Sequence, residues 1–226
     1  MNYIELFGLP GAGKTTITNP VIEALREEGF RVAGLSEVYF RNCCDRNKTK
    51  VWFEIITSLK KYPVYFQIFL YGLSVSISAS SVKFLLKFIF LVHQIMKTKE
   101  EGKYDIVLCE EGIIQHLSSL SYLKQLPDNK RLDEVMLSIT KVINIEAINC
   151  VINIEECINR VNSREESSQR FSSKIPGSVL FQALKMKEKN LMIVANHTTS
   201  VHELVLVESI DDNKNKLLSL VKQIIA

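Results

Sequence analysis

The segment Gly8–Thr16, of sequence GLPGAGKTT, constrains the fold of this chain more than any other stretch. It matches the pattern G-x-x-x-x-G-K-S/T at every fixed position, and it follows a short apolar run at residues 2–7 that we expect to be a strand. Backbone N–H groups of such a loop and the positive end of the following helix face one point, where an anion binds. An ordinary glycine turn is the alternative. The full match favours a loop that binds a nucleoside triphosphate.

The residue types within this loop suggest distinct roles. Lys14 would reach the β- and γ-phosphates, and the Thr15 hydroxyl would bind Mg²⁺. The other nucleotide contacts would come from the loop and the first helical turn, which gives the set Pro10, Gly11, Ala12, Gly13, Lys14, Thr15 and Thr16.

Composition narrows the class of protein. The length of 226 residues suits one α/β domain with an insertion or a small lid. The net charge of +3 is spread along the chain, so nucleic-acid binding gets no support. Five cysteines form no C-x-x-C pair and the four histidines share no ligand spacing, so we expect reduced thiols and no metal other than Mg²⁺. The chain begins directly with the predicted strand, without room for a signal peptide, and we expect a cytoplasmic protein.

One apolar segment approaches the length of a membrane span. Residues 62–82 carry no charge, but serines, a glycine, a glutamine and a proline interrupt them. Lys83 and Lys87 then interrupt the next apolar run. We therefore expect buried or groove-lining helices rather than a span, which leaves peripheral membrane contact open.

The remaining pattern alternates strands and helices in one domain over residues 1–226. We expect strands at 2–7, 30–35, 106–109, 148–154 and 202–208, and helices at 13–28, 51–59, 64–73, 82–97, 131–143, 155–164, 178–195 and 212–225. Asp211 or Asp212 would cap the last helix. The helices between the second and third strands form an insertion at about 40–98, which would bind the acceptor substrate.

Acidic residues stand at the ends of two predicted strands, the edge where open α/β sheets bind ligands. Glu37 follows the second strand and could accept a proton from a substrate hydroxyl, although a solvated glutamate is an equal alternative. Glu110 directly follows the third strand and is the first choice for a Mg²⁺ ligand. Glu111 could orient a nucleophile or face the substrate.

A basic region follows the fourth predicted strand. Arg160 and Arg164 lie four residues apart and so share one helix face, which suits an anion or an acidic partner. An ion pair between Glu156 and Arg160 is the alternative. The polar segment at 165–174, which contains Arg170, has the composition of a mobile loop.

In this element order and in its P-loop, the chain resembles the nucleoside and nucleotide kinases of the thymidylate kinase and adenylate kinase type. The resemblance implies an α/β P-loop fold, with a five-stranded parallel sheet of order 2-3-1-4-5 and helices on both faces. It also implies a lid at about 160–176, in which Arg160 lies against the nucleotide, Arg164 against its phosphates, and Arg170 is a lid arginine. Residues 207–212, with Asp211, resemble the loop beside the purine ring.

The acceptor half departs from that family. Thymidylate kinases usually carry Asp-Arg-Tyr after the third strand, and deoxynucleoside kinases carry Glu-Arg-Ser, whereas this chain has Glu110-Glu111-Gly112. The family's Arg-Glu-Pro after the second strand is replaced by Ser36-Glu37-Val38. An acceptor with less negative charge, such as a nucleoside, a sugar or another hydroxyl compound, follows from the lost arginine.

These observations predict an ATP- and Mg²⁺-dependent small-molecule kinase. Lys14, Arg160, Arg164 and Arg170 would stabilise the transferred phosphoryl group, and Glu37 would orient or deprotonate the acceptor. Two alternatives stay open: a nucleotide-dependent switch or ATPase whose protein partner docks on the apolar insertion, and a nucleotide-binding fold without chemistry. The pattern Asn-Lys-x-Asp of Ras-type GTPases is absent, which favours ATP over GTP, and a homodimer is left open.

Overall fold

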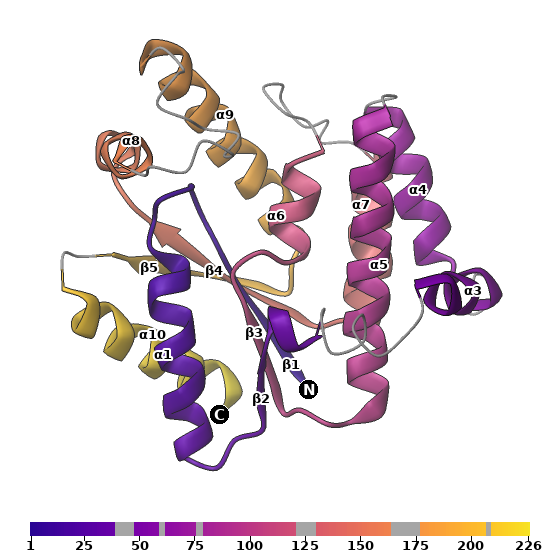
Figure 1. Ribbon diagram of the computed structural model, residues 1–226, viewed down its shortest axis with the longest axis horizontal. Helices are drawn as coiled ribbons and strands as arrows, with labels where there is room; N and C mark the ends of the chain where they lie inside the picture. The colour runs from indigo at the N-terminus through magenta and orange to yellow at the C-terminus, as the bar shows by residue number, and fades with distance from the viewer. Residues whose placement is uncertain (39–47, 59–61, 76–78, 121–129, 164–176, 207–208) are drawn as a thin grey trace.

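The five strands of the described chain form one parallel sheet. The computed structural model describes residues 1–38, 48–58, 62–75, 79–120, 130–163, 177–206 and 209–226. The sheet order is β2-β3-β1-β4-β5, as the resemblance implied (Figure 1). The strands are β1 (Asn2–Phe7), β2 (Val32–Gly34), β3 (Ile106–Cys109), β4 (Ile145–Val151) and β5 (Ser200–Val205). Every pairing is parallel, so the segments that follow β1 to β4 meet at one edge of the sheet.

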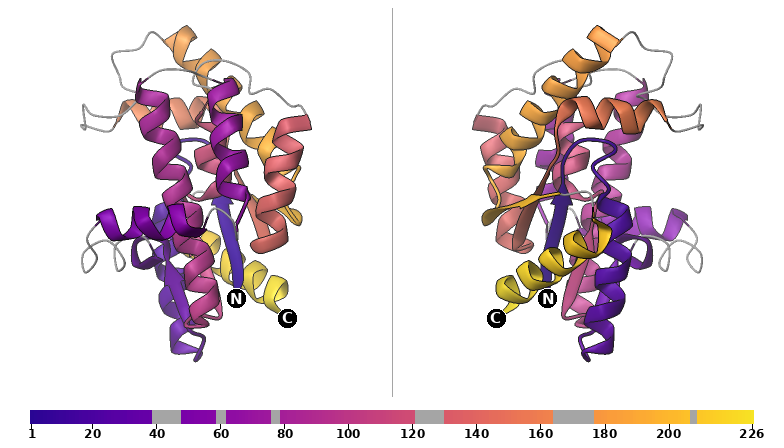
Figure 2. Two further views of the ribbon diagram at one scale, coloured as in Figure 1. Left: turned by 90° about the vertical axis from the view of Figure 1, so that its right-hand side faces the viewer. Right: turned by 90° about the vertical axis from the view of Figure 1, so that its left-hand side faces the viewer.

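Helices cover both faces of this sheet (Figure 1 and Figure 2). They are α1 (Lys14–Glu27), α3 (Lys48–Ser58), α4 (Val64–Val75), α5 (Ala79–Glu101), α6 (Ile113–Ser118), α7 (Lys130–Val142), α8 (Ile154–Asn162), α9 (Gly177–Ala195) and α10 (Ile210–Ile225). Residues 35–38 add one helical turn after β2.

The side chains of β1 point alternately to the two faces of the sheet, and the core lies in two parts, one on each face. Ile4 and Leu6 pack with the apolar faces of α1 and α10, whereas Tyr3 and Phe7 pack with α5, α6 and α7 on the opposite face. Glu5 lies on the second face with Tyr3 and Phe7 and is fully buried, which is unusual for a carboxylate. The central strand therefore carries a carboxyl group into the core, three residues before Gly8, where the P-loop begins.

The apolar insertion packs onto the body of the protein. α5 buries Phe88, Leu91, Val92 and Ile95 on its inner side, and α4 lies against both α5 and α7. In the parts of the chain that the structure describes, no helix has the length and apolar character needed to cross a membrane. Within the uncharged stretch, α4 buries Val64, Tyr65, Ile68 and Tyr71, whereas Phe66 and Leu70 are exposed, so burial accounts for part of its apolar character.

Several predicted bounds are wrong. β2 is shorter than predicted, β5 begins at Ser200 rather than at residue 202, and α3 and α5 each begin three residues earlier than predicted. β4 begins at Ile145 rather than at residue 148, and it ends before Asn153, whose side chain caps α8 by accepting the Glu155 N–H at 2.8 Å. α10 begins two residues early, because Ser209, and not Asp211 or Asp212, is its N-cap. The helix α6 was not predicted at all.

Candidate functional site

The P-loop joins β1 to α1 at the carboxyl edge of the sheet. Gly13 is the N-cap of α1 with a φ of 83°, a left-handed conformation that favours glycine. No side chain caps this end of α1, and its first turn holds no acidic residue. The first N–H groups of the helix are thus left to an external acceptor, as an anion site requires.

Lys14 is held inside this loop. Its side chain is buried, and Nζ donates hydrogen bonds to the carbonyl oxygens of Gly8 and Leu9, both at 3.0 Å. Burial lowers the pKa of Lys14, and the nearby charges of Glu110 and Glu111 act in the opposite direction. The ammonium group is therefore held by the loop, within range of the charges of the acidic residues that follow β3.

Thr15 and Glu110 come together beside Lys14. Thr15 is exposed in the first turn of α1, and its side chain lies near enough to the Glu110 carboxylate to lower the pKa of that group. Burial raises the pKa of Glu110, the neighbouring Glu111 raises it further, and Lys14 and Thr15 lower it. A hydroxyl and a carboxylate oxygen at one point are the hard ligands that Mg²⁺ prefers, so these two residues fit that ion. Among the described residues no cluster of three or more His, Cys, Asp or Glu could hold a metal by itself.

Helix α8 packs directly on the P-loop. The Cys157 thiol donates to the Pro10 carbonyl oxygen at 2.6 Å, and Nη1 of Arg160 donates to the Gly11 carbonyl oxygen at 3.3 Å. Arg160 also forms the i,i+4 ion pair with Glu156. The ion pair that was the alternative is therefore present, and the contact with Gly11 holds the same guanidinium beside the P-loop. Its contact with an anion stays a prediction. Arg164 and Arg170 lie outside the described residues.

A pocket of about 220 Å³ opens beside the same loop. It lies between the start of α1, α8 and the start of α10, and its described lining is Ala12, Gly13, Thr16, Ile17, Arg160, Leu206, Ile210 and Asn213. Asp211 is exposed in the first turn of α10, and the described lining does not include it. The mostly apolar walls beside the P-loop suit a flat nucleobase.

A second and larger pocket, of about 480 Å³, lies on the other side of the acidic residues. α1, the end of β2, α5, the end of β3 and α6 contribute its described lining, which is Asn19, Ile22, Gly34, Leu35, Ser36, Lys87, Leu91, Glu110, Glu111 and His116. Glu110 thus belongs both to the surroundings of Thr15 and to the wall of this pocket. A molecule bound here would lie next to the terminal phosphate of a nucleotide on the P-loop.

Lys87 and His116 are two ionisable residues of this pocket that the sequence did not indicate. Nδ1 of His116 lies 2.9 Å from the Gly112 carbonyl oxygen, and its ring stacks on Phe84 with centroids 5.3 Å apart. Burial lowers the pKa of His116, so the ring is neutral near pH 7. Lys87 was noticed in the sequence only as an interruption of an apolar run; its exposed position on α5 places a cation in this pocket.

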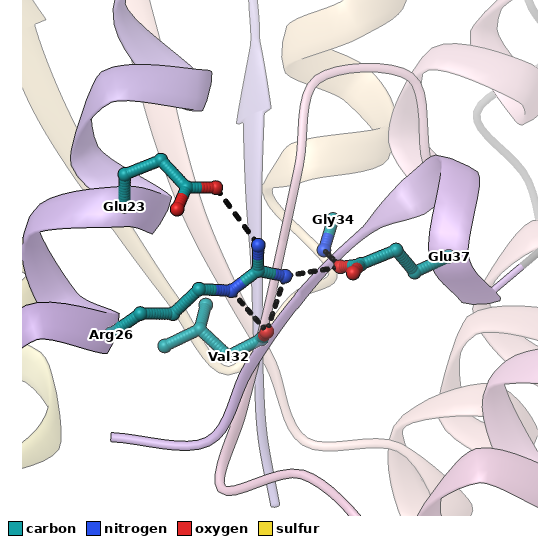
Figure 3. A network of polar contacts seen from close by, with 5 residues as sticks. All are labelled: Glu23, Arg26, Val32, Gly34 and Glu37. Carbon is teal, nitrogen blue, oxygen red and sulfur yellow. Dashed lines mark hydrogen bonds and ion pairs between the residues drawn. The ribbon is translucent and has the colours of Figure 1, made fainter. Parts of the chain in front are cut away.

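Glu37 does not take the place that was expected of it. Its Oε2 atom lies 2.5 Å from Nη2 of Arg26 and accepts the Gly34 N–H at 2.9 Å (Figure 3). Arg26 in turn donates to the Val32 carbonyl oxygen and pairs with Glu23. The described lining of the larger pocket includes Gly34, Leu35 and Ser36 but not Glu37. This geometry gives Glu37 a structural role between α1 and β2 and does not support its expected role as a base.

Glu37→Gln should therefore leave catalysis almost unchanged. The amide oxygen still accepts the Gly34 N–H, and only the part-exposed ion pair with Arg26 is lost, at a cost of about 1 kcal/mol or less. We expect a slightly lower melting temperature and turnover within about twofold of the original protein, measured by thermal denaturation and steady-state kinetics. A loss of roughly a hundredfold in turnover would instead identify Glu37 as a general base.

Comparison with known proteins agrees with the fold. A family model described as NTPase matches residues 3–67, the part of the chain that holds β1, the P-loop, α1 and β2. The match covers less than half of the chain. Together with the sheet order, it identifies a P-loop NTPase-like α/β fold. None of the curated proteins matches the sequence.

Solved structures with a similar course of the chain are distant in sequence. A deoxyadenosine kinase from M. mycoides is 14% identical with a TM-score of 0.47, and the alignment covers 98% of this chain and 99% of that chain. A sugar kinase from Janibacter sp. HTCC2649 is 14% identical with a TM-score of 0.46, over 98% of this chain and 95% of that one. Neither similarity assigns a substrate.

Proposed function

We propose that this chain is an ATP- and Mg²⁺-dependent phosphotransferase that moves the γ-phosphoryl group to a hydroxyl of a small molecule. One observation carries the proposal: Glu110 and Glu111 form the boundary between the P-loop residues Lys14 and Thr15 and a separate pocket. A protein that only binds nucleotide has no need of a second pocket at the γ-phosphate.

The donor half holds and neutralises the triphosphate. The N–H groups at the start of α1 bind phosphate oxygens, and the Lys14 ammonium exchanges its two loop carbonyls for the β- and γ-phosphates. Thr15 and Glu110 hold Mg²⁺, which neutralises phosphate charge when it is bound. Arg160 lies between the base pocket and the P-loop, where it contacts the nucleotide, and Arg164 and Arg170 stay proposed as lid residues.

The acceptor half orients one hydroxyl toward the γ-phosphate. We assign this task to Glu111, which lines the larger pocket and is exposed to it, in place of Glu37. Lys87 supplies a cation at the same pocket, so the arginine missing after β3 does not leave the pocket without positive charge. Acceptors that carry one anionic group therefore join nucleosides and sugars as candidates. Positioning and electrostatics supply nearly all of the rate enhancement.

Nucleotide hydrolysis is the second candidate, since the family model that matches residues 3–67 is described as NTPase. In that case Glu111 would orient a water molecule instead of a substrate hydroxyl. Both functions share the donor half, and they differ in whether ADP forms without an acceptor.

An acceptor screen separates these functions. The purified chain is incubated with ATP and Mg²⁺ and with nucleosides, nucleoside monophosphates, sugars and sugar phosphates, one at a time, and ADP and phosphate are measured separately. We expect ADP to rise with one class of acceptor and to match a phosphorylated product mole for mole. Free phosphate in equal amount to ADP without any acceptor, at a rate that no acceptor increases, would establish hydrolysis and overturn the transfer assignment.

A further inference from the structure

The loop that carries the two acidic residues is fixed by a carboxylate from the centre of the sheet. Oε1 of Glu5 accepts the N–H groups of Gly112 at 3.1 Å and of Gln115 at 3.0 Å. Oε2 accepts the N–H of Ile114 at 3.0 Å and the Tyr3 hydroxyl at 3.3 Å. Two carboxylate oxygens offer about four lone-pair sites, and all four are used.

The Tyr3 hydroxyl completes this arrangement. It accepts the Ile113 N–H at 3.3 Å and lies 3.2 Å from the Cys109 thiol, which donates to it. The consecutive N–H groups of residues 112–115 are the ones that an α-helix leaves unsatisfied at its start. Two side chains of β1 therefore satisfy the whole N-terminus of α6, whose own N-cap, Gly112, has no side chain to do so.

Gly112 is required by the same contacts. A Cβ atom built on Gly112 would overlap the Tyr3 hydroxyl and lie 2.6 Å from Oε2 of Glu5. The sequence Glu110-Glu111-Gly112, which departs from the kinase patterns after the third strand, is thus matched to Glu5 and Tyr3 by shape. Any side chain at this position would push the loop away from β1.

These contacts leave the acidic residues little freedom. Cys109 is in register with Glu5 in the sheet, and Gly112 is bonded to the Glu5 side chain. Only Glu110 and Glu111 lie between these two fixed points. Glu5 also stands two residues before Phe7, where β1 ends and the P-loop follows, so the same strand places both the phosphate site and the acidic loop.

We infer that Glu5 is a positioning residue that holds Glu110 against Thr15 for Mg²⁺ binding and Glu111 toward the acceptor pocket. The inference rests on the proposed function, because that function assigns the tasks of Glu110 and Glu111. Glu5 touches neither nucleotide nor acceptor and acts only through the loop.

The carboxylate is needed because every partner of Glu5 is a donor. The pKa of Glu5 is about 7, because burial raises it more than the backbone N–H donors, which favour the charged form, lower it. Above that pH the side chain is ionised, and it accepts hydrogen bonds without donating any. A glutamine has the same shape, but in either orientation its NH₂ group faces at least one backbone N–H, so one hydrogen bond is lost and two donors oppose each other.

The test compares Glu5→Gln with the original protein at about pH 8, above the pKa of Glu5. Binding of a fluorescent ATP analogue is titrated without Mg²⁺ and at rising Mg²⁺. We expect unchanged binding of the analogue without Mg²⁺. The Mg²⁺ concentration that gives half of the maximal increase in analogue binding should rise about tenfold. The matched control is Glu23→Gln, which removes a carboxylate that is 66% exposed on α1 and should change neither titration.

Two results would overturn the inference. The first is a folded Glu5→Gln variant with the original Mg²⁺ dependence. The second is an equal loss of nucleotide binding with and without Mg²⁺, which indicates a general structural role. If Glu5→Gln does not fold, Tyr3→Phe decides, because it keeps the buried ring but removes one donor to Glu5 and the acceptor for the Ile113 N–H.

This experiment is independent of the acceptor. Mg²⁺-dependent nucleotide binding that changes in Glu5→Gln supports the positioning role even if the acceptor screen yields no phosphorylated product. In that event the proposed transfer function is wrong, and the positioning role of Glu5 is kept. Once an acceptor is found, Glu5→Gln should lower kcat by about tenfold and leave the KM for ATP at saturating Mg²⁺ unchanged.

Discussion

Lys14→Ala should reduce phosphoryl transfer by about a thousandfold. The ammonium group of Lys14 is buried at the point where the P-loop, Glu110 and Glu111 meet, and no water can reproduce a fixed positive charge there. Negative charge shifts within the triphosphate during transfer, so the loss falls mainly on kcat. The measurement is steady-state turnover with the acceptor identified by the screen, or of hydrolysis if no acceptor exists.

Folding must be separated from catalysis in this variant. Removal of Nζ also takes a donor from the carbonyl oxygens of Gly8 and Leu9, which costs about 1–3 kcal/mol of stability for a buried group left unsatisfied. The Leu9 oxygen keeps the Ala12 N–H as a donor. Lys14→Met is the control for packing, because it keeps the apolar stem of the side chain and removes the ammonium group. Lys222→Ala is the control for loss of a lysine elsewhere, because Lys222 pairs with Glu28 far from the P-loop. Lys222→Ala should retain full turnover. Full turnover in folded Lys14→Ala would show that this loop does not carry out the chemistry.

The donor half of the site was predictable because its chemistry is local. The P-loop depends on consecutive residues, so the roles of Gly13, Lys14 and Thr15 could be proposed from spacing alone. In the structure the Thr15 side chain lies near the Glu110 carboxylate. β3 was also predicted with its observed bounds, because an apolar run of four residues ends sharply at Glu110. Parallel strands then place both segments at one edge, whatever the intervening chain does.

The acceptor half was not predictable because its contacts are distant in the sequence. Nothing near Glu37 indicates that Arg26, eleven residues earlier on α1, occupies its carboxylate. α6 has no capping residue of its own, since Tyr3 and Glu5 satisfy its N-terminus from more than a hundred residues away. The sequence around the N-cap Gly112 therefore carries no signal of a helix start.

The bounds of β4 failed for a different reason. Glu146 lies inside the strand, where it pairs with Ser200 and His202 of the neighbouring β5, and a glutamate at that position hides the start of the strand. At the other end, Ile152 continues the apolar pattern beyond the last paired residue. The pattern shifted the predicted strand by three residues toward its end.

The second large effect is expected at Glu111, compared directly with Glu110. Glu111→Gln should lower kcat for acceptor phosphorylation by about a hundredfold, because the amide cannot take the proton of the acceptor hydroxyl. Glu110→Gln should instead raise the Mg²⁺ requirement, because it replaces a charged ligand beside Thr15. The two residues are adjacent and both line the larger pocket, so each is the matched control for the other.

Hydrolysis in these variants separates transfer from ATPase activity. If Glu111 orients a substrate hydroxyl, Glu111→Gln loses acceptor phosphorylation, and any slow background hydrolysis stays as it was. If Glu111 orients water, the same variant loses phosphate release instead, and added acceptors change nothing. An unchanged rate of both reactions in folded Glu111→Gln would remove Glu111 from the chemistry. The acidic loop would then serve Mg²⁺ alone through Glu110, and the base would have to come from another residue of the pocket, of which His116 is neutral and able to accept a proton.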